Sequence, residues 1–486
     1  MKTESKDKTK KPANQGKERT VRNPAKINAD TEYATSDVRM SAYGGLLALM
    51  KFLDLIEFKE AFEKNYCRPT RKPALGCYRM ILGLIGLLFV GFARIGHFFY
   101  LRDDEMLCGW FGVTRLPVVS TYWRYLFSLG QGQSQSLLKL SAVLRGRVWE
   151  IRRQMHRRIT LHIDTTVATV YGKTEGARKG HNPKRRGKKA LRPVMIFIEE
   201  TGEYLLGSQR RGVTMSDREV AGLIRQVRRY LPSCVRRVLL LGDAEFIGPE
   251  TVQACEACRF EYILANKSAK PYFGEGGWYR KGEYHYNEGQ YAPQGWEKAR
   301  RFVVMRIRED QKGERQLTLF EMGYSYRCFV TNLRDKAHRV VARYDRRANV
   351  EGRIKEAQQE GILAIPSRRF WSNHAYFQVV MLTYNLWRWM QLVQKSQRSV
   401  EGEVQREEDV QEVESEVDHT IRIARLKLLF VPARITESHR QTVVKYSVHD
   451  VRVAELLDFM EYLDRKREGK RSWLLEVPIN RAKISA

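Results

Sequence analysis

The chain has 486 residues, 43% of them hydrophobic, and 86 Lys and Arg against 56 Asp and Glu give it a formal net charge of +30. Its length predicts two to four domains of roughly 150 residues each, and its apolar content, sufficient for real cores, excludes a wholly disordered chain. Because so large a charge excess repels itself in a folded protein, we expect a polyanionic partner, nucleic acid first, with an anionic membrane surface or plain solubility as alternatives.

A basic tail and a helical region open the chain. Residues 1–36 are Lys-rich and nearly free of apolar periodicity, which predicts a disordered tail. Residues 37–157 repeat apolar positions at three- and four-residue spacing, which predicts a helical DNA-binding domain. Within it, residues 102–130 have the outline of a helix-turn-helix, although plain packing would explain the same pattern. The second helix would offer to a DNA groove the side chains of Ser120, Thr121, Tyr122 and Arg124.

A mixed α/β sheet is predicted over residues 158–269. Ile159, Leu161 and Ile163 alternate with polar residues on one strand, and a Thr-Gly turn then joins two further strands. Helical segments separate the later strands. Strands that first form a hairpin and then alternate with helices are typical of a mixed sheet.

The pattern changes again after residue 269. Residues 272–296 hold eight aromatics and six glycines, so residues 270–343 are expected to form a β-rich insertion. Helices resume over 344–394, where a second part of the domain begun by residues 158–269 is expected. Residues 395–418 are acidic and polar, which indicates a linker, and residues 419–486 form a C-terminal segment that ends in a helix.

Cysteines and apolar runs indicate the cellular setting. The seven cysteines are scattered and odd in number, which predicts reduced thiols in a cytosol. Cys255 and Cys258 form one Cys-x2-Cys pair, but no second pair or suitably spaced His pair completes a zinc site. The longest apolar stretch, residues 80–93, has 14 residues, which is short for a membrane span. With no signal peptide in the polar start, we expect a cytoplasmic protein without membrane contact.

Two acids stand on strands of the predicted sheet. Asp164 lies on its first strand, and Asp243 ends the apolar run 238–242. Ligand sites of α/β sheets lie at strand ends, and two carboxylates held close are best tolerated with a divalent cation between them. Oxygen ligands suit Mg²⁺ or Mn²⁺, and such a site on a basic protein suits phosphodiester chemistry. Two unrelated surface acids are the alternative.

A third acid is expected on a later helix. Glu351 follows Arg347 by four residues, and Lys355 lies one turn further on. A solvent-facing ladder of ion pairs would give the same pattern. Two other acids of the helix compete with Glu351. Glu356 lies about 140° and Glu360 about 180° around the axis from it, so only one of these faces meets the strand ends.

The order Tyr344-x2-Arg347-x3-Glu351 resembles the Tyr-Arg-Glu-Lys signature of DDE transposases from bacterial insertion sequences. "IDTTVATVYGKTEGARKGHNPKRRGKKALRP", "RIGHFFYLRDDEMLC" and "HAYFQVVMLTYNLW" are similar to the insertion-sequence family numbered thirteen-eighty, and the resemblance runs over most of residues 37–460. It implies an RNase H-like catalytic domain interrupted by the β-rich insertion. It also implies that two Mg²⁺ or Mn²⁺ ions bind to Asp164, Asp243 and Glu351.

Two positions depart from the family pattern. The Lys of the signature, seven residues after the Glu, is Gln358, so a Lys contact to phosphate must be absent or come from Lys355. Family members often carry an Arg two residues before the second Asp and a Gly two residues after it, where this chain has Leu241 and Glu245. Glu245 would either perturb the metal site or point away from it.

Basic and aromatic residues suggest how DNA would be held. Between Arg178 and Lys189 the chain has seven basic residues and no acid, which predicts a phosphate-tracking loop rather than a merely solvated one. The DNA contacts expected from this loop and from the signature are Lys184, Arg185, Arg186, Lys188, Tyr344, Arg347 and Lys355. Trp278 and Trp296 would stack on a base flipped from a DNA hairpin or transposon end, unless they pack in the core.

These features predict a cut-and-paste transposase. It would bind the terminal inverted repeats of its own mobile element, cut double-stranded DNA and join the freed 3′-hydroxyl to target DNA. By family resemblance it would act as a homodimer on the nucleoid of a bacterium. A non-catalytic DNA-binding relative and an RNase H-like nuclease without strand transfer are the alternatives.

Overall fold

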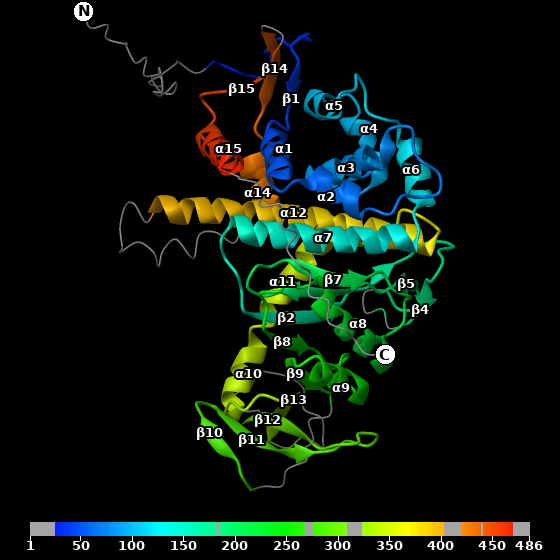
Figure 1. The fold of residues 1–486 in the computed structure, drawn as a ribbon, viewed down its shortest axis with the longest axis vertical. Coiled ribbons are helices and arrows are strands. Elements are labelled where there is room, and N and C mark those ends of the chain that lie inside the picture. Colours follow the sequence, from blue (N-terminus) through cyan, green and yellow to red (C-terminus); the bar gives the residue numbers. More distant parts are fainter. Residues whose placement is uncertain are drawn as a thin grey trace, which may run out of the picture.

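A computed structural model describes residues 25–180, 182, 185–267, 276–308, 323–402, 419–438 and 441–469. Two long helices, α7 and α12, lie side by side between a layer of shorter helices and a mixed sheet (Figure 1). The sheet has the strand order β10-β11-β12-β13-β9-β8-β2-β6-β7. The architecture is therefore mixed α/β, with the helical residues before 152 gathered at one end.

The helical pattern expected before residue 157 is present. Apolar side chains bury one face of most of these helices, and α3 is buried along nearly its whole length. None of the helices in the described parts of the chain is long and apolar enough to cross a membrane. The helices are α1 (Leu46–Leu55), α2 (Phe58–Asn65), α3 (Gly76–Phe89), α4 (Phe98–Leu101), α5 (Glu105–Phe111), α6 (Val119–Ser128) and α7 (Gln131–Ile151).

The centre of the sheet is parallel. Strand β2 (Arg158–Thr165) pairs in parallel with β8 (Arg237–Gly242), which pairs in parallel with β9 (Glu261–Asn266). The predicted hairpin, β6 (Val194–Ile198) and β7 (Tyr204–Ser208), adds two antiparallel strands. Helices α8 (Asp217–Tyr230) and α9 (Pro249–Ala257) follow β7 and β8 along the chain.

Amide side chains of α12 form hydrogen bonds with backbone groups of the outer strand β7. Asn385 accepts a hydrogen bond from Tyr204 N at 2.8 Å and donates one to Tyr204 O at 2.8 Å. Gln378 donates to Gly207 O at 2.9 Å. A strand edge that is satisfied by side chains in this way cannot pair with another chain.

The strands expected in the β-rich insertion extend this same sheet. Strand β13 pairs antiparallel with β9, from Cys328 opposite Asn266 to Thr331 opposite Ile263. Four strands thereby lengthen the sheet, at the end far from the helical layer in Figure 1. Pairing satisfies the backbone groups that β9 would otherwise expose. The strands are β10 (Tyr279–Lys281), β11 (Tyr284–Tyr291), β12 (Arg300–Arg308) and β13 (Tyr324–Thr331).

The second half of the chain returns to the helical layer. Helices α10 (Ala337–Asp345) and α11 (Ala348–Ala357) lead through a π-helical turn, Gln358–Ile362, to α12 (Phe370–Gly402). Helix α12 thus covers the first residues of the expected linker, and the remainder, 403–418, lies outside the described residues.

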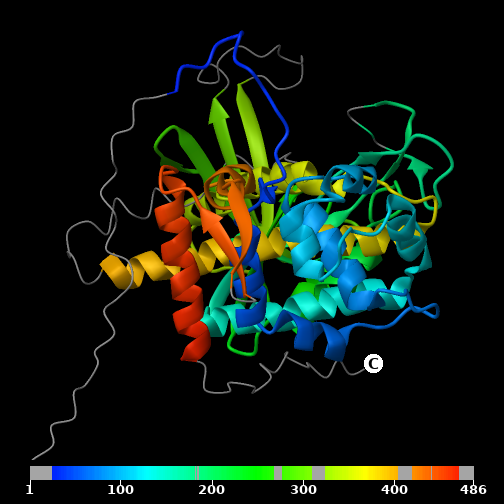
Figure 2. The ribbon, with the colours of Figure 1, turned by 90° about the horizontal axis from the view of Figure 1, so that it is seen from above.

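The C-terminal segment packs beside the first helices. Strand β1 (Met40–Ser41) pairs with β14, and α15 lies against α1, as Figure 2 shows from above. The elements of this segment are α14 (Ile421–Ala424), a π-helical turn (Arg425–Leu429), β14 (Ala433–Ser438), β15 (Gln441–Tyr446) and α15 (Arg452–Glu468). A further small sheet joins β3 (Ala168–Thr169), β5 (Lys189–Leu191) and β4 (Arg178–Lys179).

One fully buried ion pair joins the helices to the sheet. Arg145 of α7 donates to Glu203, beside β7, with 2.7 Å between Nε and Oε2, and both side chains are 0% exposed. The guanidinium also donates to Tyr204 O and Tyr230 O, and Trp149 Nε1 donates to the other Glu203 oxygen. The pair is therefore fully hydrogen-bonded, which is the condition under which a buried charge pair is tolerated.

We expect Glu203→Gln to destabilise the protein by about 3–5 kcal/mol, because it leaves the Arg145 charge buried without a partner. Thermal or urea unfolding of the full chain would measure the loss. Asp103→Asn is the matched control: it breaks the Arg115–Asp103 pair, whose side chains are 54% and 62% exposed, and should change stability far less, because solvent screens an exposed pair. Equal effects of the two substitutions would contradict the assignment.

Candidate active site

Two aspartates emerge side by side from the parallel centre of the sheet. Ile163 of β2 pairs with Gly242 of β8, so the residues that follow, Asp164 and Asp243, lie at the same end of neighbouring strands. Arg347, the residue before α11, lies between the two acids. Its Nη2 atom is 3.2 Å from Asp164 Oδ2 and 4.0 Å from Asp243 Oδ2. The structure thus brings together three of the predicted site residues.

The surroundings of Asp164 disfavour the ionised form of its carboxyl group. The pKa of Asp164 is raised to about 6, chiefly by burial; the positive charge of Arg347 opposes this rise, and the negative charges of Asp243 and Glu245 add to it. Thr165 N donates to Asp164 Oδ1 at 2.7 Å, which favours the ionised form. Desolvation is the largest of these effects, and a carboxyl group shifted by burial beside a second acid is a common feature of functional sites.

A second layer of polar groups supports the two aspartates. Glu245 accepts a hydrogen bond from Thr165 Oγ1 at 3.1 Å and forms an ion pair with Arg192, while its own backbone N donates to Asp243 Oδ1 at 2.9 Å. Glu245 therefore points into the site rather than away from it. Sequence reasoning missed Arg192 altogether. In the sequence, Arg192 is marked only by its position two residues before β6, the strand that pairs with β2.

Glu351 lies in the first turn of α11 and is exposed. Arg347 precedes the helix, and its guanidinium contacts the two aspartates. Within the described residues, no three His, Cys, Asp or Glu side chains are grouped closely enough to hold a metal ion. The structure therefore joins Asp164 to Asp243 but does not add Glu351 to them.

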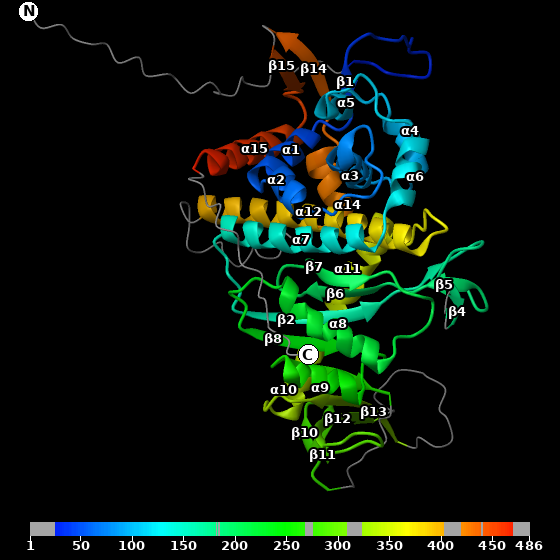
Figure 3. The ribbon, with the colours of Figure 1, turned by 45° about the vertical axis from the view of Figure 1, so that its right-hand side comes forward.

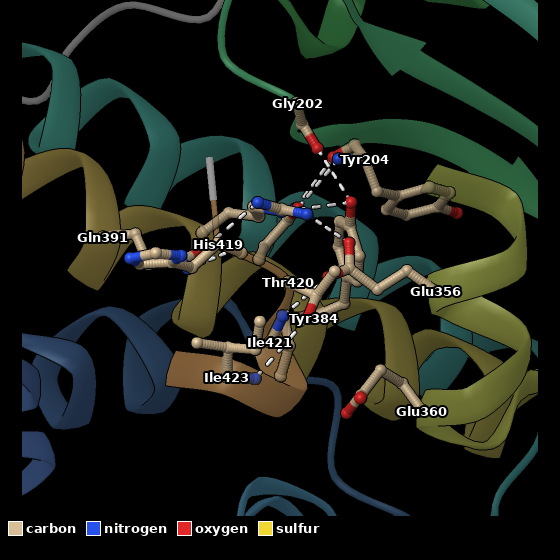
Figure 4. A network of polar contacts seen from close by, with 12 residues as sticks. Gly202, Tyr204, Glu356, Glu360, Tyr384, Gln391, His419, Thr420, Ile421 and Ile423 are labelled. Carbon is tan, nitrogen blue, oxygen red and sulfur yellow. Dashed lines mark hydrogen bonds and ion pairs between the residues drawn. The ribbon is translucent and has the colours of Figure 1, made fainter. Parts of the chain in front are cut away.

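The two other acids of this region serve the fold. Glu356 forms an ion pair with Arg388 of α12 and accepts a hydrogen bond from Ile421 N at 2.7 Å (Figure 4). Glu360 forms an ion pair with Arg425, which also donates to Phe89 O at 2.8 Å. Both carboxylates are buried. Glu351 is consequently the one acid of the three that these ion pairs leave available for other work.

The remaining signature residues divide between core and surface. Tyr344 is buried against Phe329, with ring centroids 4.6 Å apart, and Lys355 is exposed. Gln358, at the position of the signature's Lys, donates to Thr166 Oγ1 at 2.7 Å and so reaches the loop that follows Asp164. Tyr344 in this position supports the fold and offers little surface to DNA.

The basic loop is placed at the surface by the small sheet β3-β5-β4. Arg185, Arg186 and Lys188 are exposed, and the Arg185 guanidinium lies 6.0 Å from the ring centroid of Tyr171. Lys184 lies outside the described residues. The three described cations are thus accessible to a polyanion.

The aromatic candidates differ from expectation. Tyr122 is buried, and its ring stacks on Phe98 with 3.8 Å between centroids, so it cannot reach a DNA groove in this arrangement. The helical repeat points Arg124 outward instead. The Arg306 guanidinium lies 4.0 Å from the Trp278 ring centroid, and Trp296 packs near Phe302. Both tryptophans are thus half-buried and already in contact with neighbours.

Replacing Asp164 by Asn should stabilise the metal-free protein at about pH 8, by roughly 1–3 kcal/mol. A pKa raised from 3.8 to about 6 in the folded state means that stability falls as the pH rises through this range. Unfolding in the presence of a chelator would show the gain near pH 8 and its loss near pH 4. Asp103→Asn, where Arg115 lowers the pKa of the acid, should give no gain; an equal gain would show that the Asp164 environment is not responsible.

Comparisons with known proteins place the chain in a family. The model of the family "Transposase DDE domain group 1" matches residues 25–468. No curated protein matches. A solved piggyBac transposase synaptic complex with hairpin DNA is similar at 10% identity and a TM-score of 0.39, over 91% of this chain and 87% of that one. A Mos1 transposase paired-end complex with the left transposon end has 12% identity and a TM-score of 0.15, over 40% and 60%. Because the family model spans nearly the whole chain, the protein belongs to the DDE-domain transposases of group 1.

Proposed function

We propose that this transposase binds the terminal inverted repeats of its own element, cuts double-stranded DNA there and joins the 3′-hydroxyl ends to target DNA. The observation that carries the proposal is the pair Asp164 and Asp243, which leave parallel strands in register with one cationic group between them. The catalytic fold would be RNase H-like, and the element a bacterial insertion sequence of the family numbered thirteen-eighty.

The aspartate pair suits a divalent cation. A guanidinium already lies between the two carboxylates, and yet Arg347 Nε and Nη2 are buried without a hydrogen-bond partner. The free donors of Arg347 suit an anion such as a DNA phosphate, whereas the two carboxylates suit a metal cation. We propose that Asp164, Asp243 and Glu351 hold Mg²⁺ or Mn²⁺, two ions in the complete site. Such ions activate an attacking oxygen and stabilise a leaving oxygen.

The chain's own residues would prepare this chemistry. Thr165 and the Glu245 backbone each donate to one aspartate, which fixes the orientation of both carboxylates. Glu356 and Glu360 anchor the region that follows Glu351 through buried ion pairs. Arg347 and the exposed Lys355 would contact phosphate once DNA is bound. Two copies of the chain, one for each end, would work together on the nucleoid.

One observation favours a non-catalytic DNA-binding protein instead. Glu351 is not grouped with the aspartates in the described structure. If this arrangement persists on DNA, the protein would bind without cutting. Cleavage assays with Glu351 variants distinguish the two functions.

Glu351→Gln should preserve folding and DNA binding and lower Mg²⁺-dependent cleavage of element ends by about 10²- to 10³-fold or more, because it removes one negative ligand. Asp243→Asn should do the same. Cleavage and strand transfer are followed on labelled DNA, with binding measured separately. Glu60→Gln is the matched control, since Glu60 is also exposed in the first turn of a helix, α2. Robust cleavage by the Glu351 variant would remove Glu351 from the site.

Replacing Arg185, Arg186 and Lys188 by Ala should weaken binding to all DNA sequences alike. The dependence of log K on log salt should flatten by roughly one unit for each lost phosphate contact. Arg68, Arg71 and Lys72, exposed in a loop of the helical layer, form a matched triple control. An unchanged slope in the loop variant would mean that these cations are only solvated.

A further inference from the structure

Four exposed aromatic side chains lie on two helices of the helical layer. Phe99 and Tyr100 of α4 are 71% and 70% exposed, and Trp123 and Phe127 of α6 are 38% and 52% exposed. We call these four residues the aromatic ridge. Single exposed apolar residues are ordinary on a protein surface, whereas a group of large rings usually marks a binding site.

The ridge follows from the way the two helices pack. Phe98 of α4 stacks on Tyr122 of α6, and Tyr125 is buried alongside. Because side chains four residues apart share one face of a helix, burial of the Tyr122 face turns Trp123 and Phe127 outward together. The exposure of Trp123 and Phe127 thus follows from the helical repeat.

Positive charge accompanies the rings. Arg124 is exposed on the same side of α6, and its described contact is a long one, 3.4 Å to Thr121 Oγ1. Arg369 donates to Phe127 O at 2.7 Å, and its guanidinium lies 4.9 Å from the centroid of the Phe127 ring. More than half of the Phe127 side chain nevertheless stays exposed.

Nearby acids are already paired. Asp103 forms an ion pair with Arg115, and Glu105 forms one with Arg39. Asp104 accepts hydrogen bonds from Leu107 N and Ser41. Among the described residues, the contacts of Arg124 and Arg369 include no carboxylate. Aromatic rings beside such arginines are complementary to nucleic acid rather than to a basic or purely apolar partner.

The ridge is connected to the candidate active site through the start of α12. Beyond Arg369, Phe370 N donates to Glu175 at 2.9 Å, and Glu175 N donates to Arg368 O at 2.9 Å. Glu175 belongs to the segment between β3 and β4, which begins a few residues after Asp164. Figure 3 shows α6, the start of α12 and the strands β4 and β5 on one side of the molecule. One DNA strand lying along this side would meet the basic loop, Arg369 and the ridge in turn.

We propose that the aromatic ridge binds unpaired bases of a DNA strand, with the backbone of that strand held by Arg124 and Arg369. Groove readers present hydrogen-bonding side chains to base edges, whereas this face of α6 presents rings, which suit the flat faces of unstacked bases. The inference rests on the proposed function only in taking DNA as the substrate. It does not depend on cleavage.

The test compares three DNAs of one sequence: a single strand, a blunt duplex and a duplex with an unpaired tail. Binding to the full chain is measured by fluorescence anisotropy in a chelator, so that no cleavage occurs. Trp123→Ala and Phe127→Ala should each weaken binding of single-stranded and tailed DNA about tenfold, and binding of the blunt duplex less than about twofold. Trp123→Phe and Phe127→Tyr keep a ring and should bind almost normally. Ser128→Ala, at an exposed position of the same helix, is the control for local disturbance.

Several outcomes would overturn the ridge. An equal loss on all three DNAs would indicate a backbone or groove contact. Unchanged binding together with a smaller assembly in solution would indicate that the ridge joins two copies of the chain. Wild-type protein that binds the duplex, gains no affinity from the tail and does not bind the single strand would overturn the ridge alone. Wild-type protein that binds no DNA would overturn the proposed function. Because the rings are exposed, unfolding midpoints of the variants should match the wild type.

Discussion

Two like charges at the ends of neighbouring parallel strands are the constraint on which the rest of the site depends. The β2–β8 register puts Asp164 beside Asp243, and burial disfavours the ionised form of Asp164. The fold answers with Arg347 between the acids and with donors from Thr165 and the Glu245 backbone. A site that concentrates negative charge in this way is unfavourable for stability and suited to binding a metal ion.

Much of this could be predicted from local patterns. Alternation over residues 158–165 and the apolar run before Asp243 indicate two strands. If these strands run in parallel, the acids at their ends lie at the same edge of the sheet. The choice of Glu351 over Glu356 and Glu360 agrees with the contacts of the latter two, which are buried beside Arg388 and Arg425. Those arginines lie 32 and 65 residues away from their partners along the chain. Local sequence patterns therefore cannot show that these residues pair.

Other features could not be predicted because they depend on tertiary contacts. A helical pattern shows that α6 has an apolar face but not how wide that face is, and the Phe98 contact decides that Tyr122 is inside and Trp123 outside. Aromatic and glycine content predicts strands after residue 270. It does not show that β13 would pair with β9 and lengthen the central sheet. The spacing of Arg347 and Glu351 along the chain does not show that the Arg347 guanidinium lies between Asp164 and Asp243, which come from two distant strands.

The pairing of β1 with β14 has a consequence for the making of this protein. Met40 lies opposite Arg434, and α1 packs against α15, so the first helices are covered by residues that are synthesised about 400 positions later. Until then the apolar faces of α1 lack their final partners, and contacts across such a separation form slowly. A chain cut short before α15 would therefore have an incomplete helical layer, even though Asp164, Asp243 and Glu351 had all been synthesised. The helical layer is therefore completed only after β14 and α15 have been synthesised.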